Sequence, residues 1–176
     1  MEWCVMWLAH ALTLSRLPIA IGLTQTYGNT AWSVALIALA ALTDALDGNV
    51  ARWMQRRGHT TPDIGGWLDP LIDKIFVVIV LATIWFHTHD AVLIGLIAAR
   101  EIVLVPLVIA YLVRRQPTSH LHADAIGKAA TIAQFVACAV AVAAPRFAIP
   151  VAVIAAGLGL AAVAHYVVRE RRDATV

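Results

Sequence analysis

Four aspartates lie in a part of the chain that is otherwise largely apolar: Asp44, Asp47, Asp69 and Asp73. The first two are three residues apart and the last two are four apart, so each pair lies on one face of a helix. An ionised side chain in the middle of a membrane-spanning helix costs about 2.5–3.5 kcal/mol on insertion scales. We therefore expect the four carboxylates to share a compensating partner.

The two acidic pairs can form one site if their helices are neighbours. Antiparallel helices joined by a loop can bring their acidic faces opposite each other, so that the four carboxylates converge. Clustered carboxylates repel unless they are protonated or neutralised, and an all-oxygen donor set suits a hard divalent cation. Mg²⁺ or Mn²⁺ is the expected cofactor, and the lack of histidine in the pattern argues against zinc.

Small residues and one arginine accompany the acidic pairs. Gly48 and Ala51 fall on or beside the first acidic face, where short side chains would let a ligand approach the helix backbone. Arg52, one turn beyond Gly48, can donate charge-assisted hydrogen bonds to a phosphate. Gly65 precedes the second pair by one turn and predicts a close approach there as well.

The complete pattern is Asp44-x-x-Asp47-Gly48-x-x-Ala51-Arg52 followed by Gly65-x-x-x-Asp69-x-x-x-Asp73. It resembles the signature of the CDP-alcohol phosphotransferase family. The interval between Arg52 and Gly65 is longer than the family usually has. An extra cytoplasmic turn could absorb it without moving either helix, although the neighbours of a bound nucleotide would then differ.

The resemblance implies an enzyme that transfers a substituted phosphate from a CDP-linked donor, usually CDP-diacylglycerol, to an alcohol and releases CMP. The residues implied to bind the CDP part are Asp44, Asp47, Gly48, Ala51, Arg52, Gly65 and Asp69. The implied metal ligands are Asp44, Asp47, Asp69 and Asp73. Asp73 would also be the catalytic general base toward the acceptor hydroxyl, and the resemblance implies a homodimer.

The acceptor alcohol is suggested by three further segments, Leu68–Lys74, Ala99–Glu101 and Gly127–Gln134. They look more like the phosphatidylglycerophosphate synthase and cardiolipin synthase branches than the inositol branch. In this interpretation Arg100 and Lys128 lie toward a cavity and bind a phosphate-bearing acceptor such as glycerol 3-phosphate. The alternative is that both cations extend toward the membrane surface from helix ends, or that Arg100 pairs with the neighbouring Glu101.

Arg16 is a second arginine in an apolar segment. The family commonly has an Asn-x-x-Thr-x-x-Arg pattern near its start; Thr13 and Arg16 match it, whereas His10 replaces the Asn. Arg16 is accordingly a candidate contact for a substrate phosphate.

His87, His89 and Asp90 also resemble a metal-binding group. They fall at the opposite end of their segment from the acidic pairs. We expect them to form a solvated turn.

The rest of the sequence predicts the scaffold that holds these residues. Of 176 residues, 61% are hydrophobic and 14% are charged, and the mean hydropathy is +0.79, which is typical of a membrane protein. The expected spans are approximately Leu8–Tyr27, Thr30–Trp53, Gly66–Phe86, Ala91–Val113, Ile126–Ala144 and Phe147–Val168. The predicted fold is an all-α integral membrane protein with six transmembrane helices and a polar cavity open to the cytoplasm, with residues 1–176 forming one domain.

The distribution of arginine predicts the orientation, because cytoplasmic loops accumulate positive charge. Eight arginines fall on one side of the predicted membrane: Arg52, Arg56, Arg57, Arg114, Arg115, Arg169, Arg171 and Arg172. Arg146 falls on the other. We expect the site and both termini on the cytoplasmic side of the cell (inner) membrane, and the net charge of +2 is too small to suggest a nucleic-acid partner.

Two other interpretations fit intramembrane acids. An ion or proton transporter would use them as a pathway, but such acids are expected through the membrane depth rather than together at one side. The second interpretation is a relative that has lost activity and serves as a partner subunit. The intact aspartates argue against it. For the enzyme, the acceptor could be phosphatidylglycerol, as in cardiolipin synthases, instead of glycerol 3-phosphate.

Overall fold

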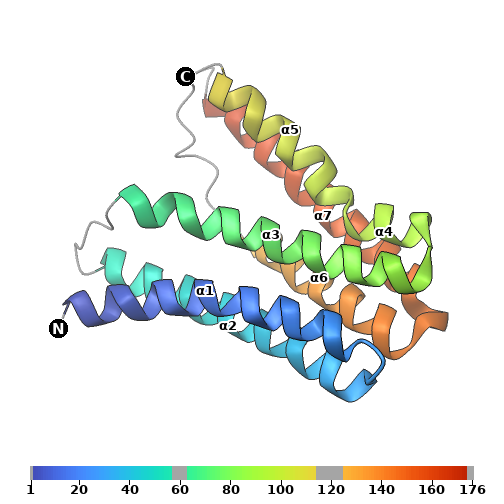
Figure 1. Ribbon diagram of the computed structural model, residues 1–176. Helices are drawn as coiled ribbons and strands as arrows, with labels where there is room; N and C mark the ends of the chain where they lie inside the picture. Colours follow the sequence, from blue (N-terminus) through green and yellow to red (C-terminus); the bar gives the residue numbers. More distant parts are fainter. Residues whose placement is uncertain (1, 57–62, 114–124, 174–176) are drawn as a thin grey trace. The chain divides into compact units, whose positions relative to one another are not determined.

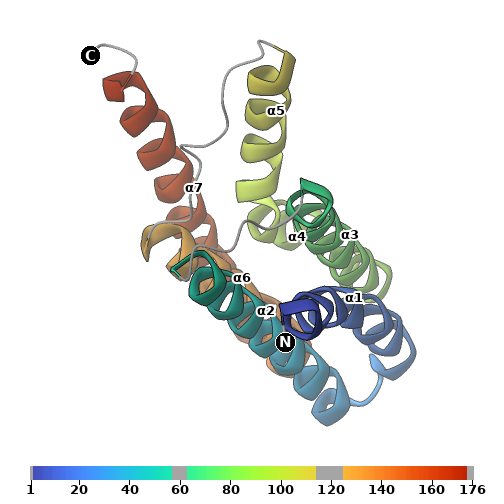
Figure 2. The ribbon, with the colours of Figure 1, turned by 90° about the vertical axis from the view of Figure 1, so that its left-hand side faces the viewer.

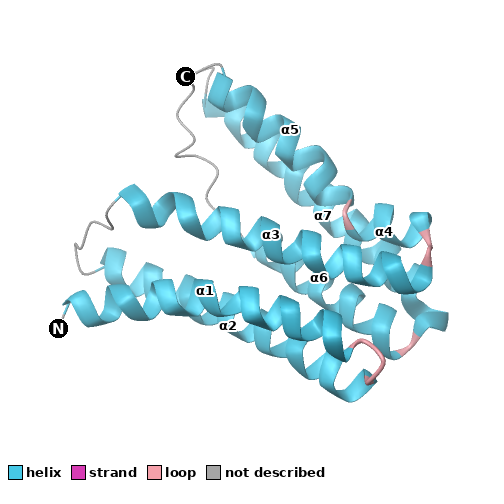
Figure 3. Cartoon of the chain, in the orientation of Figure 1, coloured by secondary structure: helices cyan, strands magenta, loops and turns pink. Residues whose placement is uncertain are grey.

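The structure is a computed structural model that describes residues 2–56, 63–113 and 125–173 (Figure 1). Side chains are left undescribed at residues 2–10, 12–13, 47–56, 63–71, 73, 108–113, 125 and 169–173. The helices are α1 (Glu2–Thr26), α2 (Thr30–Arg56), α3 (Asp63–Thr88), α4 (Ala91–Ile97), α5 (Ala99–Val113), α6 (Ala125–Ala143), the 3₁₀ helix η2 (Pro145–Phe147) and α7 (Ala148–Asp173). The all-α prediction is confirmed for the described part of the chain (Figure 3).

The chain divides into two compact units, Met1–Thr88 and His89–Val176. In the first unit, α1 packs against both α2 and α3 (Figures 1 and 2). The turn from α1 to α2 is held by side chains: Ser33 Oγ donates to the Thr26 carbonyl over 2.8 Å, and the Trp32 N–H donates to Asn29 Oδ1 over 3.3 Å. Because Ser33 is fully buried, this polar contact fixes the hairpin from inside the unit.

In the second unit, α7 packs against α4, α5 and α6. The buried face of α7 is built from small residues, among them Ala152, Ala155, Ala156 and Ala162. At Gly159, an added Cβ atom would lie 2.9 Å from Arg100 Cβ, so α5 approaches α7 at a point where α7 has no side chain. Small residues allow this close packing of helices, as is usual between helices in membranes.

Within the predicted span Ala91–Val113, the helix is interrupted at Ala98, which divides it into α4 and α5. A side chain of another helix contacts residues on both sides of this break. Gln134 Nε2 of α6 donates to the Ile97 carbonyl over 3.2 Å and to Glu101 Oε2 over 2.8 Å. The side chain of a distant residue thus takes part in the hydrogen bonding of the backbone at the break.

Each of the other predicted segments corresponds to one long helix whose ends differ by a few residues. Among described residues, Ile126–Ala143 and Pro145–Val168 are long and apolar enough to cross a membrane, and Thr30–Leu46 and Lys74–Thr88 are shorter apolar segments. The six-span arrangement stays a prediction.

Candidate functional site

The first half of the signature lies within the continuous helix α2. A buried stripe on this helix runs through Ser33, Ile37 and Ala40 at intervals of four and three residues. Continuing these intervals leads to Asp44 and then to the positions of Asp47, Gly48 and Ala51. The acidic face of α2 is therefore the extension of its packed face.

The second half of the signature lies within the helix α3, which also has a buried stripe. The buried side chains Ile72, Phe76 and Val80 form a stripe along this helix. By helix periodicity, the positions of Asp69 and Asp73 lie on the same side as this stripe. The sequence pattern thus falls on the two helices that pack against α1.

Arg16 of α1 contacts Asp44 of α2 directly. Its Nη2 atom lies 3.3 Å from Asp44 Oδ1. The side chain of Arg16 is 2% exposed, whereas that of Asp44 is 34% exposed. The guanidinium is thus enclosed by the protein, and one of the four carboxylates has a cationic partner supplied by a third helix.

The structure therefore places one of the four aspartates with its contacts. The side chains of the other three, and those of Gly48, Ala51, Arg52 and Gly65, lie outside the described residues. Their convergence and their roles stay predictions. Among the described side chains, no group of three His, Cys, Asp or Glu residues is placed to hold a metal ion.

The long interval between Arg52 and Gly65 is partly helical. The helix α2 continues to Arg56, and α3 begins at Asp63. Both helices thus extend into the interval by several residues beyond the predicted spans.

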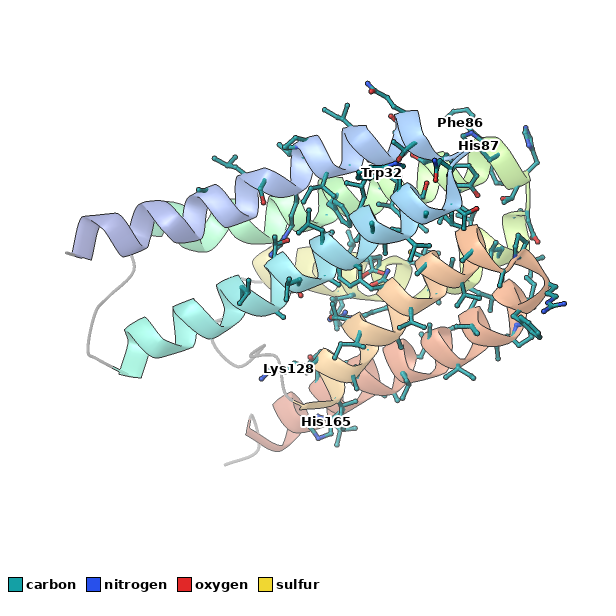
Figure 4. All side chains as sticks on the ribbon, turned by 90° about the horizontal axis from the view of Figure 1, so that it is seen from below. Trp32, Phe86, His87, Lys128 and His165 are labelled. Carbon is teal, nitrogen blue, oxygen red and sulfur yellow. The ribbon has the colours of Figure 1, made fainter. Side chains whose placement is uncertain are left out.

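Arg100 lies in the second unit, at the first turn of α5. Its Nη1 atom donates to Thr131 Oγ1 of α6 over 2.8 Å, and its Nε atom is buried without a hydrogen-bond partner in the described part of the chain. Arg100 is thus partly engaged by the protein, through Thr131 rather than Glu101. Lys128 is exposed at the first turn of α6, and its side chain extends away from the helix (Figure 4).

The group at His87, His89 and Asp90 has structural contacts. The ring of His87 stacks on Tyr27 with centroids 3.9 Å apart, and its Nδ1 atom lies 2.8 Å from the Thr83 carbonyl oxygen. Asp90 caps α4 by accepting from the Leu93 N–H over 3.0 Å. Both histidines are exposed. His89 lies in the connection between α3 and α4, whereas His87 belongs to the last turn of α3, where Figure 4 shows it beside Phe86.

A family model described as CDP-alcohol phosphatidyltransferase matches residues 6–167. The chain belongs to this family. The match covers α1, both signature helices and the following helices into α7, so the family predicted from the signature is confirmed.

Curated relatives in this family include the human cardiolipin synthase (CMP-forming), which is 30% identical over 156 residues, covering 78% of this chain and 50% of the human protein. The CDP-diacylglycerol–glycerol-3-phosphate 3-phosphatidyltransferase of Salmonella choleraesuis (strain SC-B67) is 32% identical over 110 residues, or 61% of this chain and 58% of that protein. The enzyme of the same name from Blochmanniella floridana is 44% identical over 62 residues, or 33% of this chain and 30% of that protein.

The chain spans about half the length of the first of these curated relatives. No solved structure matches it. The relatives have the names of the two branches that the sequence segments resemble, so the similarity to both branches is confirmed.

Sequence reasoning missed the contact between Arg16 and Asp44. The available signal was an arginine within an apolar segment, which requires a partner. The sequence does not specify which carboxylate provides it, because the two residues lie on different helices. Sequence reasoning also missed Gln134 and Thr131, whose partners are likewise on another helix.

Proposed function

We propose that this chain is a membrane enzyme that moves the phosphatidyl group of CDP-diacylglycerol to an alcohol acceptor and releases CMP. The observation that carries the proposal is the intact signature on the two helices α2 and α3, within a family match that covers residues 6–167. Glycerol 3-phosphate is the proposed acceptor. The Salmonella relative is named for that substrate.

The proposed cofactor is Mg²⁺ or Mn²⁺, held by Asp44, Asp47, Asp69 and Asp73. The donor set fits such an ion because carboxylate oxygens are the ligands that these hard cations prefer. Asp44 also fits by its exposure, since about one-third of its side chain is open to solvent. When bound, divalent cations neutralise a diphosphate and stabilise the charge that develops on the departing CMP.

The residues of the chain have separate tasks in this mechanism. Arg52 binds phosphate oxygens, while Gly48, Ala51 and Gly65 leave room for the CDP part beside the helix backbones. Asp73 accepts the proton of the acceptor hydroxyl. The acceptor oxygen then forms a bond to the phosphorus that bears diacylglycerol, and the bond from that phosphorus to the CMP oxygen breaks.

Arg100 and Lys128 are the proposed contacts for the phosphate of the acceptor. Arg100 supports this role because its guanidinium has five N–H donors, of which the hydrogen bond to Thr131 uses one, and its side chain is half-buried rather than enclosed. For Lys128 the support is its exposed position at the first turn of α6, from which a flexible ammonium can reach an anion.

We further propose six transmembrane segments, a polar cavity open to the cytoplasm, both termini on that side of the cell (inner) membrane, and a homodimer. The arginine distribution supports the orientation. The two long apolar segments Ile126–Ala143 and Pro145–Val168 support the membrane location.

Phosphatidylglycerol is the second candidate acceptor, with cardiolipin as the product. The similarity that favours it is to the human cardiolipin synthase, which covers 78% of this chain. The two products differ in mass and can be separated from one incubation.

The test incubates the purified chain with CDP-diacylglycerol and, in parallel, glycerol 3-phosphate, phosphatidylglycerol, inositol phosphate or serine. CMP and the lipid product are identified with and without a divalent cation. Metal-dependent CMP release with phosphatidylglycerophosphate as the product supports the proposal, and cardiolipin as the product supports the second candidate. Ion flux across vesicles without any CMP release would instead support the transporter.

A further inference from the structure

We propose that Arg16 is a positioning residue, which holds the carboxylate of Asp44 from α1 and does not contact the substrate. This inference rests on the proposed function, since Asp44 must be a metal ligand for its position to affect the reaction. It replaces the expectation that Arg16 contacts a substrate phosphate.

Burial is the first argument. The side chain of Arg16 is 2% exposed, so a phosphate that enters from solvent cannot reach it without displacing protein atoms. A buried guanidinium is costly unless a partner compensates its charge. Asp44 is such a partner, because its Oδ1 atom lies 3.3 Å from Arg16 Nη2.

The geometry of the pair leaves Asp44 able to bind a further ligand. A carboxylate has two oxygens with several acceptor positions, and the ion pair recorded here uses one of those oxygens. The side chain of Asp44 is 34% exposed, so part of it is open although Arg16 lies against it. Arg16 can therefore fix the orientation of this carboxylate and leave room for an ion.

The part of α1 that carries Arg16 is packed inside the first unit. Arg16 lies on a buried stripe of α1 with Ala20 and Leu23, which follow at intervals of four and three residues. This helix packs against both α2 and α3. The guanidinium is thus held by the helix that packs against both α2 and α3. Supporting residues of this kind orient metal ligands.

Replacing Arg16 has two opposite effects on metal binding. Loss of the positive charge makes the acidic group more negative, which attracts a cation. Loss of the contact lets the carboxylate of Asp44 turn away, which weakens binding by about 10- to 100-fold in comparable supporting contacts. If Arg16 acts by positioning, the second effect is larger and Arg16→Met weakens Mn²⁺ binding.

The experiment measures Mn²⁺ binding to the full chain in detergent by electron paramagnetic resonance, which needs no activity. Wild type, Arg16→Met and Arg16→Lys are compared, and Arg146→Met is the control because Arg146 is exposed and lies over the ring of Phe147. We expect a loss of at least about tenfold in Mn²⁺ affinity for Arg16→Met, a smaller loss for Arg16→Lys, and none for the control. Unchanged or tighter Mn²⁺ binding by a folded Arg16→Met protein overturns the proposal.

Melting curves and size-exclusion profiles show whether each variant is folded. If Arg16→Met does not fold, Arg16→Lys decides alone: a folded Arg16→Lys protein with weakened Mn²⁺ binding supports the proposal, and one with wild-type binding overturns it. Absence of Mn²⁺ binding by the wild type overturns it as well.

Kinetics separate positioning from substrate contact. For a positioning residue, kcat falls and the acceptor KM stays within about twofold of wild type. A KM for the acceptor that rises at least about tenfold, with the rate restored at high acceptor concentration, overturns the proposal. If the wild type releases no CMP, the proposed function fails, while the Mn²⁺ comparison still tests the role of Arg16.

Discussion

The contact between α5 and α7 gives a prediction whose size follows from the structure. Gly159→Ala would place a Cβ atom 2.9 Å from Arg100 Cβ and 3.7 Å from Arg100 Cα. The first of these atoms is bonded directly to the backbone of α5 and cannot rotate away. The two helices must separate to admit the methyl group.

The cost of this separation can be isolated with a matched control. Gly157 lies on the same helix, and a Cβ added there would meet no heavy atom within 4 Å. Each Gly→Ala change in a helix stabilises the folded state by about 0.5–1 kcal/mol through backbone propensity. Overpacking costs about 1–3 kcal/mol, so this is the expected difference in the free energy of unfolding between the two variants.

The assay is reversible unfolding of the full chain in mixed micelles of increasing denaturing detergent. Gly157→Ala is expected to be as stable as wild type or more stable, and Gly159→Ala is expected to be less stable than Gly157→Ala. Equal free energies of unfolding for the two alanine variants would show that α5 and α7 are not in contact at Gly159, and would refute the packing of the second unit described above.

Three further changes have definite expected outcomes. Asp73→Asn should lower turnover by about 10²- to 10⁴-fold, because the acceptor hydroxyl loses its base. Binding of CDP-diacylglycerol, measured by calorimetry, should be largely retained. Unchanged turnover would show that Asp73 is not the general base. Chelation by EDTA should abolish CMP release, and added Mg²⁺ or Mn²⁺ should restore it, whereas release that persists in EDTA contradicts a metal requirement. Gln134→Leu should lower the free energy of unfolding by about 1–3 kcal/mol in the micelle assay, because the Ile97 carbonyl and the Glu101 carboxylate lose a donor. Ile132→Leu, at an exposed position of the same helix, is the control. Equal stability of the Gln134→Leu and Ile132→Leu variants would contradict the two hydrogen bonds of Gln134.

Helices could be predicted from the sequence because their signals are local. Long apolar runs and the polar breaks between them place most helix ends within a few residues of those observed. The turn at Asn29 and the cap at Asp90 likewise depend on residues within four positions. Local spacing also predicts that each acidic pair of the signature lies on one face of its helix.

Contacts between helices could not be predicted in the same way. The break at Ala98 involves Gln134, which is distant in sequence, and no proline or glycine occupies the break itself. Similarly, Arg16 was recognised as an arginine in an apolar segment, but its pairing with Asp44 requires the packing of α1 on α2. Such partners follow from the tertiary arrangement, which a single sequence read by itself does not specify.

The central claim is that carboxylates from α2 and α3 bind the same divalent ions. The most direct test is an anomalous difference map from crystals of the chain grown with Mn²⁺ and a CDP-linked ligand. The account predicts manganese peaks about 2.1–2.2 Å from carboxylate oxygens of both helices, Asp44 or Asp47 on one side and Asp69 or Asp73 on the other. Peaks bound by one helix alone, or carboxylates that point in different directions with no shared ion, would contradict it.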